Sequence, residues 1–306
     1  MKECAGYVAT IGFFDGVHRG HQYLIEQVKT LAQETGHKSM VITFDCHPRH
    51  VLHSDYKPKL LSSPEVKRLL LSRLRVNHIE VLHFDASLAA LSAKDFMRDV
   101  LQNKLNVKCL VLGYDNRFGR SGKQEGFDDY VAYGKELGID VVRACELCDD
   151  IKLSSSQIRH LLEEGDIKRA NNCLGYEYTI VGKVVGGFQN GRQMGFPTAN
   201  LDTTAWGLLT PAPGVYAVKV RRKNSMTVQR GMMNIGSRPT FDGESQTLEV
   251  NIFDFRDNIY NEVLLVSFVK RIREERKFSS PEELAHQLEK DKIEIENLFN
   301  RRNDEE

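Results

Sequence analysis

Residues 8–28 read VATIGFFDGVHRGHQYLIEQV. The stretch begins with apolar residues suited to a buried strand, passes through a glycine-bearing loop, and continues with apolar residues at helical spacing. His18 and His21 therefore fall where the loop enters the helix N-terminus. Unpaired backbone N–H groups and the helix dipole favour an anion at that point. The stretch predicts a strand, loop and helix that bind nucleotide phosphate.

The residue types of the loop support this interpretation. Glycines allow tight turns and close approach of the backbone to a ligand. His18 and His21 are three residues apart and can reach the same phosphate oxygens. A His-x-x-His pair alone is more often a metal site or a chance surface pair, but here strand, turn and helix follow one another directly. The loop residues expected to contact the nucleotide are Gly12, Phe14, Asp15 and Gly20.

Length and composition limit what else the protein can be. A chain of 306 residues exceeds the usual size of a single core, so two domains are expected. Lys plus Arg and Asp plus Glu both total 42, which gives no support for a nucleic-acid partner. No stretch resembles a secretion signal or a membrane span. We therefore expect a soluble, cytoplasmic protein that binds no membrane, and the oligomeric state stays open.

The pattern of strands and helices changes near residue 175. Before it, apolar strand-like runs alternate with helical segments, which is typical of a parallel sheet covered by helices. After it, alternating strands joined by Gly, Pro, Asn and Asp predict an antiparallel barrel or sandwich with a C-terminal helix. We predict a Rossmann-like α/β domain over residues 1–165 and an antiparallel β-barrel domain over residues 166–306. Residues 154–174 between them are expected to be helical.

Two further segments of the first half bear on the nucleotide. Ligands bind beyond the carboxyl ends of parallel strands, and Asn116 and Arg117 follow such a strand. We expect them to contact base and phosphate. The run SSSQIR at residues 154–159 is typical of a helix N-terminus, and Arg159 lies one turn in. Capping alone would explain the serines without requiring the arginine. The serines expected to bind nucleotide are Ser154, Ser155 and Ser156.

A cluster of potential zinc ligands follows the strand at residues 39–44. It contains Cys46, His47, His50 and His53. Proline at position 48 interrupts regular helical spacing, and the array lacks the paired spacings of structural zinc sites. We therefore interpret the segment as a loop that lines the ligand pocket.

The second half contains two candidate groups. In GFPTANL, the side-chain oxygens of Thr198 and Asn200 suit a magnesium ion and phosphate oxygens, and Gly195 and Pro197 shape the turn before them. A tight barrel turn would produce the same pattern. Glu249 lies on the alternating strand TLEVNIFDF, where it is equally well explained as a solvent-facing residue.

Six motifs occur in a fixed order along the chain: GFFDGVHRGH, SSSQIR, GFPTANL, PGVYAV, NIGSRPTF and TLEVNIFDF. Together they resemble the bacterial bifunctional riboflavin kinase/FMN adenylyltransferase family, also called FAD synthetase, over nearly the whole chain. GFPTANL is specific for the flavokinase module, whereas many nucleotidyltransferases share His-x-Gly-His. The resemblance implies a nucleotidyltransferase domain followed by a riboflavin kinase barrel. It implies two reactions, from riboflavin and ATP to FMN and ADP, and from FMN and ATP to FAD and pyrophosphate, both assisted by Mg²⁺.

The resemblance also assigns roles to the residues of the first half. His18 and His21 would stabilise charge on the ATP phosphates. Arg159, with the serine-rich helix start, would hold the departing pyrophosphate. The ionised FMN phosphate needs no strong general base.

In the second half, the resemblance makes Glu249 the base that activates a ribityl hydroxyl. Thr198 and Asn200 match the ligands of magnesium and phosphate. The substrates would be riboflavin, FMN and ATP. The residues expected to contact flavin in either half are Phe44, His47, Pro48, Phe118 and Arg238.

Two other classes of protein fit parts of the sequence. A nucleotidyltransferase with a single activity and a degenerate barrel would keep the first half, but intact GFPTANL and Glu249 argue against it. A flavin- or nucleotide-binding regulator could keep the fold without turnover, because fold does not guarantee activity. Product formation distinguishes both from the bifunctional enzyme.

Overall fold

The computed structural model describes most of the chain, and of residues 237–240, 243–245, 302 and 303 it describes the backbone alone. The described residues are 6–52, 58–114, 116–120, 125–147, 153–187, 195–240 and 243–303. The chain divides into two compact units, Met1–Pro58 with Pro64–Ser154, and Lys59–Ser63 with Ser155–Glu306. This division falls before the helix that the sequence-based boundary after residue 165 assigns to the first domain.

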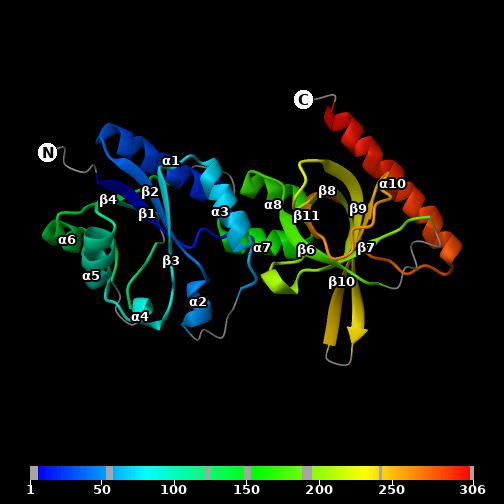
Figure 1. The fold of residues 1–306 in the computed structure, drawn as a ribbon, viewed down its shortest axis with the longest axis horizontal. Helices are drawn as coiled ribbons and strands as arrows, with labels where there is room; N and C mark the ends of the chain where they lie inside the picture. The colour runs from blue at the N-terminus through cyan, green and yellow to red at the C-terminus, as the bar shows by residue number, and fades with distance from the viewer. Residues whose placement is uncertain are drawn as a thin grey trace. The chain divides into compact units, whose positions relative to one another are not determined.

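A five-stranded parallel sheet forms the centre of the first unit (Figure 1). Its order is β3-β2-β1-β4-β5. Because β1 lies in the middle, with β2 and β3 to one side and β4 and β5 to the other, the strand order reverses there. Ligands bind at such a switch point in open α/β sheets. The strands are β1 (Tyr7–Ile11), β2 (Lys38–Phe44), β3 (His78–Leu82), β4 (Val107–Leu112) and β5 (Asp140–Arg143).

Helices cover both faces of this sheet. On one face, Ile25 of α1 (Arg19–Glu34) and Leu71 of α3 (Pro64–Arg73) pack with residues of β1, β2 and β4. On the other face, Met97 of η2 (Phe96–Lys104), which has π-helical hydrogen bonding, packs with Tyr130 of α6. The predicted Rossmann-like α/β domain is confirmed. Its remaining helices are η1 (Asp15–Val17), α2 (Pro48–Val51), α4 (Ala86–Ala89), α5 (Ala93–Asp95) and α6 (Phe127–Leu137).

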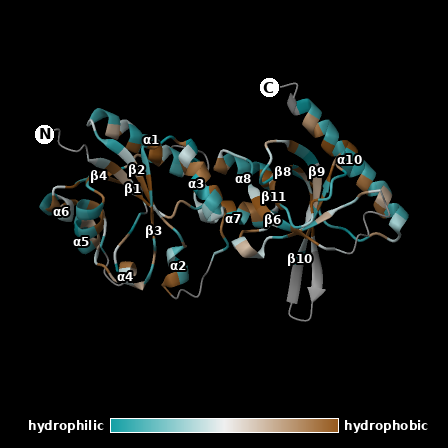
Figure 2. Cartoon of the chain, viewed as in Figure 1, coloured by the Kyte–Doolittle hydropathy of each residue, from teal (hydrophilic) through white to brown (hydrophobic). Residues whose placement is uncertain are grey.

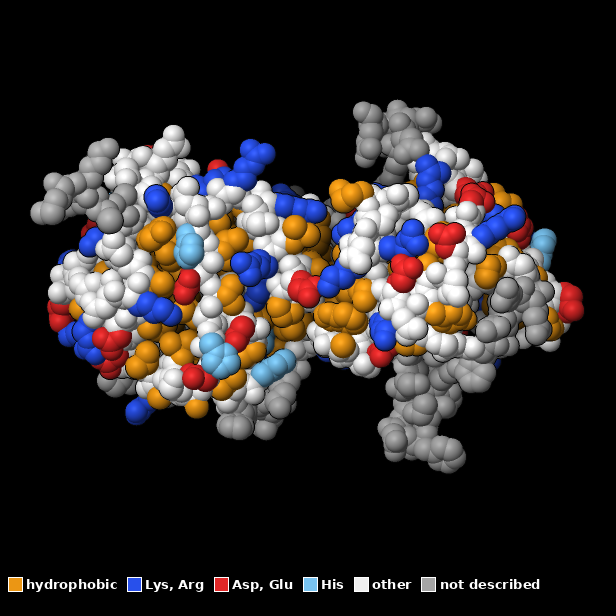
Figure 3. Space-filling view, in the orientation of Figure 1, with side chains coloured by type: hydrophobic (Ala, Val, Ile, Leu, Met, Phe, Trp, Pro, Cys, Tyr) orange, Lys and Arg blue, Asp and Glu red, His pale blue; other side chains and the backbone are white. Residues whose placement is uncertain are grey.

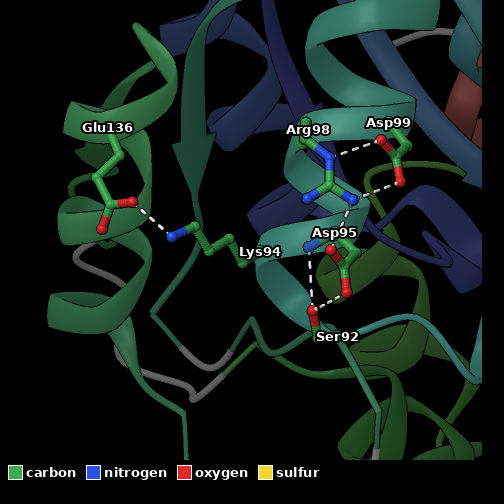
Figure 4. Close-up of polar contacts among 6 residues, drawn as sticks. All are labelled: Ser92, Lys94, Asp95, Arg98, Asp99 and Glu136. Carbon is green, nitrogen blue, oxygen red and sulfur yellow. Dashed lines mark hydrogen bonds and ion pairs between the residues drawn. The ribbon is translucent and has the colours of Figure 1, made fainter.

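A polar cap forms the N-terminus of α5, which leads directly into η2 (Figure 4). Ser92 Oγ accepts a hydrogen bond from the backbone N–H of Asp95 and donates to its carboxylate. Arg98 also donates to Asp95, and Lys94 donates to Glu136 of α6. The exposed ion pairs contribute little by themselves, whereas the N-cap satisfies a free N–H group at the helix start.

Six described strands close into an antiparallel barrel in the second unit, so the barrel alternative is confirmed over the sandwich (Figure 1). The order around it is β10-β7-β6-β11-β8-β9, and β9 pairs with β10 to close the ring. Strand β7, which contains Asn200, was not recognised as a strand from the sequence. The strands are β6 (Thr179–Val185), β7 (Ala199–Asp202), β8 (Gly214–Arg222), β9 (Val228–Thr240), β10 (Gly243–Ile252) and β11 (Val263–Arg273).

The helical segment expected at residues 154–174 forms two helices, α7 (Ser155–Glu164) and α8 (Ile167–Leu174). Gly165 separates them in a left-handed conformation with φ of 79°. Such a conformation ends a helix and is easiest for glycine. A short helix η3 (Thr204–Trp206) follows β7.

The segment Lys59–Ser63 belongs to the barrel unit although unit 1 surrounds it in sequence. The N–H of Leu60 donates to the carbonyl of Gly207 at 3.0 Å, and the N–H of Leu209 donates back to Leu60 at 2.9 Å. Nε of Arg159 donates to the carbonyl of Lys59 at 2.8 Å. These bonds connect the segment to the barrel unit, and Leu60 takes part in an isolated parallel β-bridge.

Helix α10 (Pro281–Asn303) packs one face on the barrel, and Figure 2 shows hydrophobic and hydrophilic residues mixed along it. Ile295 and Phe299 contact a cluster of strand residues that includes Val215 and Met232. In the part of the chain that the structure describes, no helix is long and apolar enough to cross a membrane.

Asp291, 2% exposed, fixes α10 to β11 because it accepts hydrogen bonds from Nε of Arg273 at 2.9 Å and from Gln287 at 2.6 Å. Replacing Asp291→Ala removes the carboxylate partner of the partly buried guanidinium. We expect a loss of about 2 kcal/mol in the free energy of unfolding. Trp206, the only tryptophan, reports unfolding of the barrel unit by fluorescence in urea.

The matched control is Glu294→Ala on the same helix. Glu294 pairs with Lys270 at 3.5 Å, and both side chains are 52% exposed. Its loss should cost less than about 1 kcal/mol. Equal effects of the two substitutions would contradict the anchoring role of Asp291.

Candidate active sites

The loop after β1 has a strained backbone. Phe14 and Val17, neither of them glycine, adopt positive φ angles of 53° and 39°. Gly16 between them has φ of 72°. Positive φ is uncommon for side-chain-bearing residues, and such strain clusters at functional sites. The loop therefore adopts a costly conformation at the switch point of the sheet.

His18 and His21 lie together as expected. His18 is the N-cap of α1, and its Nδ1 accepts a hydrogen bond of 3.4 Å from the N–H of His21. This bond assigns the ring hydrogen of neutral His18 to Nε2. The two rings stack with centroids 3.6 Å apart and planes 19° apart. A Cβ at Gly20 would approach the His18 ring to 3.2 Å, so glycine leaves room for the stack.

His21 stays neutral at physiological pH. Burial of the ring, followed by the positive charges of His18 and Lys67, holds the pKa of His21 well below its ordinary value of 6.5. Its Nδ1 is buried without a hydrogen-bond partner among the described residues, and the ring packs edge-on against Phe14 at 5.1 Å. A neutral imidazole can donate one hydrogen bond to phosphate without bringing a full charge.

We expect the imidazole resonances of His21 to remain those of a neutral ring at pH 6.5, with the change occurring below it. The unfolded chain takes up this proton near pH 6.5, so the neutral ring stabilises the fold above that pH and the contribution is lost as pH falls. NMR titration measures this, with His21→Gln assigning the signals. A midpoint at or above 6.5 would contradict the burial argument.

An apolar cavity of about 200 Å³ lies at the carboxyl ends of β1, β2, β3 and β4. Phe44, Pro48 and Phe118, three of the residues expected to contact flavin, line it together with the predicted nucleotide residues Asn116 and Arg117. Its other lining residues are Ile11, Gly12, Phe13, Leu52, Phe84, Leu88, Ala89, Leu91, Phe96 and Gly119. Flat apolar walls with a few polar groups suit an aromatic ring system.

Hydrogen bonds and ring contacts position the residues that form the cavity walls. The amide of Asn116 donates to the carbonyl of Ile11, which ties the loop after β4 to β1. Phe118 stacks on Tyr130 with centroids 4.4 Å apart. His47 does not line the cavity, but its ring contacts Phe13 with centroids 4.6 Å apart. On one face of the first unit, Figure 3 shows hydrophobic side chains exposed beside histidines.

The remaining predicted residues of the first half are less closely grouped. Asp15 is buried in η1 after the strained turn. Ser155 and Ser156 begin α7, as expected for a helix N-terminus, and Ser154 precedes them. Arg159 is buried on α7 in the second unit. Its expected role at the phosphates stays a prediction.

No zinc group forms after β2 in the described residues. There, no group of three His, Cys, Asp or Glu side chains could hold a metal ion. His53, the last member of the predicted cluster, lies outside the described residues. His47 instead caps α2 by accepting from the N–H of Arg49 at 3.2 Å.

In the barrel, strand pairing places the predicted residues side by side. Asn200 of β7 is paired with Glu249 of β10, and Glu249 is paired with Asn234 of β9. Directly paired residues project from the same face of a sheet. Oγ1 of Thr198 donates to the Glu249 carboxylate at 3.3 Å. A hydroxyl, a carboxylate and two amides therefore gather on one face of the barrel.

Asn251 supports this group through the residue that precedes Thr198. Only 7% exposed, it donates a hydrogen bond of 2.7 Å to the carbonyl of Pro197, directly before Thr198. Sequence reasoning missed both Asn251 and Asn234. The motif NIGSRPTF contributes to the family resemblance. Only the strand register, however, shows that its asparagine is paired with Glu249.

Two predicted residues of the second half are less informative. Gly195 is exposed with φ of 82° at the turn before Thr198. Arg238 lies on β9, and its side chain is outside the described part of the chain.

Oxygen ligands present at the barrel site fit magnesium. Mg²⁺ prefers hard oxygen ligands and commonly uses few protein groups together with substrate phosphates. Thr198 and Asn200, next to the Glu249 carboxylate, supply a hydroxyl and an amide oxygen of this kind. The pair therefore passes the chemical test for a magnesium–nucleotide site.

Gly187 leaves the space that the side chain of Asn200 occupies. A Cβ at Gly187 would lie 2.0 Å from Nδ2 of Asn200, far inside van der Waals contact. Gly187→Ala should therefore displace the Asn200 amide and reduce whatever turnover the barrel site supports on the order of tenfold to 100-fold. With riboflavin, ATP and Mg²⁺, chromatography of FMN measures the loss.

Gly186→Ala is the matched control, because a Cβ there meets nothing within 4 Å. It should leave this turnover within about twofold of the wild type. An active Gly187→Ala protein would show that the position of Asn200 is unimportant.

Comparisons with known proteins place the chain in a class and then in a family. Residues 1–157 match the family model described as FAD synthetase, and residues 174–299 match that described as riboflavin kinase. The chain thus belongs to a class of two-domain transferases. The bifunctional riboflavin kinase/FMN adenylyltransferase of Bacillus subtilis is 40% identical over 304 residues, covering 97% of this chain and 94% of the relative. That of Haemophilus influenzae is 38% identical, covering 96% and 95%.

The chain belongs to the bifunctional riboflavin kinase/FMN adenylyltransferase family. A crystal structure described as that of a macrolide-efflux protein from Streptococcus pneumoniae also resembles it. That chain has a TM-score of 0.86 and 33% identity, and the match covers 96% of this chain and 94% of the other.

Proposed function

We propose that this chain phosphorylates riboflavin to FMN with ATP and adenylylates FMN to FAD with release of pyrophosphate. Residues 1–165 carry the adenylyl transfer and residues 166–306 the phosphorylation. The pairing of Glu249 with Asn200 and its hydrogen bond to Thr198 are the chief support, because they join a potential base to a potential magnesium site. Family membership supports the same pair of reactions.

In adenylyl transfer, the phosphate of FMN attacks the α-phosphorus of ATP, and the bond to pyrophosphate breaks. The attacking phosphate is ionised, so positioning and charge stabilisation are sufficient. His18 and His21 at the N-terminus of α1 donate hydrogen bonds to the ATP phosphates. Arg159, with the serines before it, holds the pyrophosphate. The flavin ring occupies the cavity lined by Phe44 and Phe118.

In the kinase reaction, a ribityl hydroxyl attacks the γ-phosphorus of ATP, and the bond to ADP, the leaving group, breaks. Glu249 accepts the hydroxyl proton, which a neutral alcohol must lose to act as a nucleophile. Thr198 and Asn200 would hold Mg²⁺, which would supply positive charge to the phosphate oxygens. Asn251 keeps Thr198 in place through the carbonyl of Pro197.

The proposed partners are small molecules alone: riboflavin, FMN, ATP and Mg²⁺. We further propose that the enzyme works in the cytoplasm. Equal numbers of acidic and basic residues, 42 of each, support the absence of a nucleic-acid partner.

Two substitutions should separate the reactions. His21→Ala is expected to reduce conversion of FMN to FAD about 100-fold and to spare FMN formation. Glu249→Gln should reduce FMN formation about 100-fold and spare FAD formation from supplied FMN. Chromatography of riboflavin, FMN and FAD over time, in separate incubations with riboflavin or FMN plus ATP and Mg²⁺, measures both.

Each variant carries its own control. FMN formation tests the unchanged half of His21→Ala, and FAD formation from FMN tests the unchanged half of Glu249→Gln. Equal damage to both reactions in folded protein would refute the assignment to separate halves. Wild-type protein that binds flavin or ATP but forms no product would instead indicate a regulator.

A further inference from the structure

A buried lysine lies behind the apolar cavity and belongs to none of the motifs that define the family resemblance. Lys67 lies on α3 and is only 4% exposed. Its Nζ donates hydrogen bonds to the carbonyls of Phe13 at 3.1 Å and Phe44 at 2.9 Å. It also lies 3.8 Å from the centroid of the Phe13 ring. The ammonium group is thus surrounded by two carbonyl oxygens and an aromatic face.

These contacts join the ends of two strands. Phe44 is the last residue of β2, and Phe13 lies in the loop just after β1. Thr43 also donates to the Phe13 carbonyl, at 3.1 Å. Both phenylalanine rings line the cavity, whereas Lys67 does not. Lys67 therefore bonds to the backbone of two cavity walls without lining the cavity itself.

We propose that Lys67 is a positioning residue for FAD formation, which holds Phe13 and Phe44 at the separation that the flavin ring of FMN requires. This inference rests on the adenylyl transfer proposed for the first half. Lys67 acts through the loops because its Nζ is enclosed by protein groups. Its loss should consequently weaken the binding of FMN more than it slows the transfer of AMP.

Several charged groups face Lys67. Asp15 of η1 and Asp45 and Cys46, which follow β2, favour its charged form, and His21 of α1 experiences its positive charge. Burial dominates and lowers the pKa of Lys67 to about 8. The ammonium form, with three donors, therefore predominates at pH 7, and the neutral amine forms as pH passes about 8. The contacts with Phe13 and Phe44 should weaken over that range.

Lys67→Met tests the proposal, because it keeps the length of the side chain and removes the donors and the charge. KM for FMN in FAD formation should rise about tenfold, while kcat falls less and FMN formation from riboflavin is unchanged. Arg68→Met, one residue further along α3 and exposed, is the matched control and should match the wild type. A merely structural role would reduce the amount of active enzyme or its melting temperature without raising KM for FMN.

Lys67→Arg and the pH dependence supply independent readouts. Arginine stays charged over the whole range, so Lys67→Arg should recover part of the affinity for FMN and keep it between pH 7 and about 9. In the wild type, KM for FMN should rise as pH passes about 8. If Lys67→Met does not fold, this wild-type profile decides the matter.

An unchanged KM for FMN in folded Lys67→Met, or a constant wild-type KM across that pH range, overturns the positioning role. Failure of the proposed function gives a different result, since wild-type protein would then form no FAD from FMN and ATP at any pH.

Discussion

Parallel hydrogen bonding of β1 to both β2 and β4 is the constraint on which the first site depends. Tyr7 to Ile11 pair in register with Lys38 to Ile42 on one side, and β4 pairs on the other. The carboxyl ends of the three strands therefore meet, and the loops that follow them are brought together from distant parts of the sequence. The turn at Phe14 and the stacked histidines have a costly conformation. The rigid sheet offsets this cost because it fixes the backbone on either side of them.

The barrel uses a different principle to assemble its site. Antiparallel register places Asn200, Glu249 and Asn234 in one row across three strands, so no loop is needed to bring them together. Side chains on neighbouring strands are held more precisely than side chains on loops. Glycine at position 187 preserves this arrangement, because a Cβ there would overlap the amide of Asn200.

Periodicity and motifs predicted both architectures and most of the residues that the structure brings together. The stretch around His18 and His21 contains its strand, turn and helix within a few residues, so local rules were sufficient there. Lys67 could not be found in this way, because a lysine on an amphipathic helix is normally exposed and only the packing of α3 shows its carbonyl partners. Asn234 and Asn251 were missed for a similar reason, since strand register is a long-range property.

The path of the chain between the two units has a consequence for dividing the protein. The chain enters the barrel unit at Lys59, leaves it after Ser63, and returns at Ser155. A fragment that starts at residue 155 would lack the segment whose Leu60 bonds to Gly207 and Leu209. The two halves are thus interleaved in sequence, and a gene that begins at residue 155 cannot encode all the residues that the barrel unit uses. Separation of the domains by gene fission would expose a hydrogen-bonding edge that the intact chain covers.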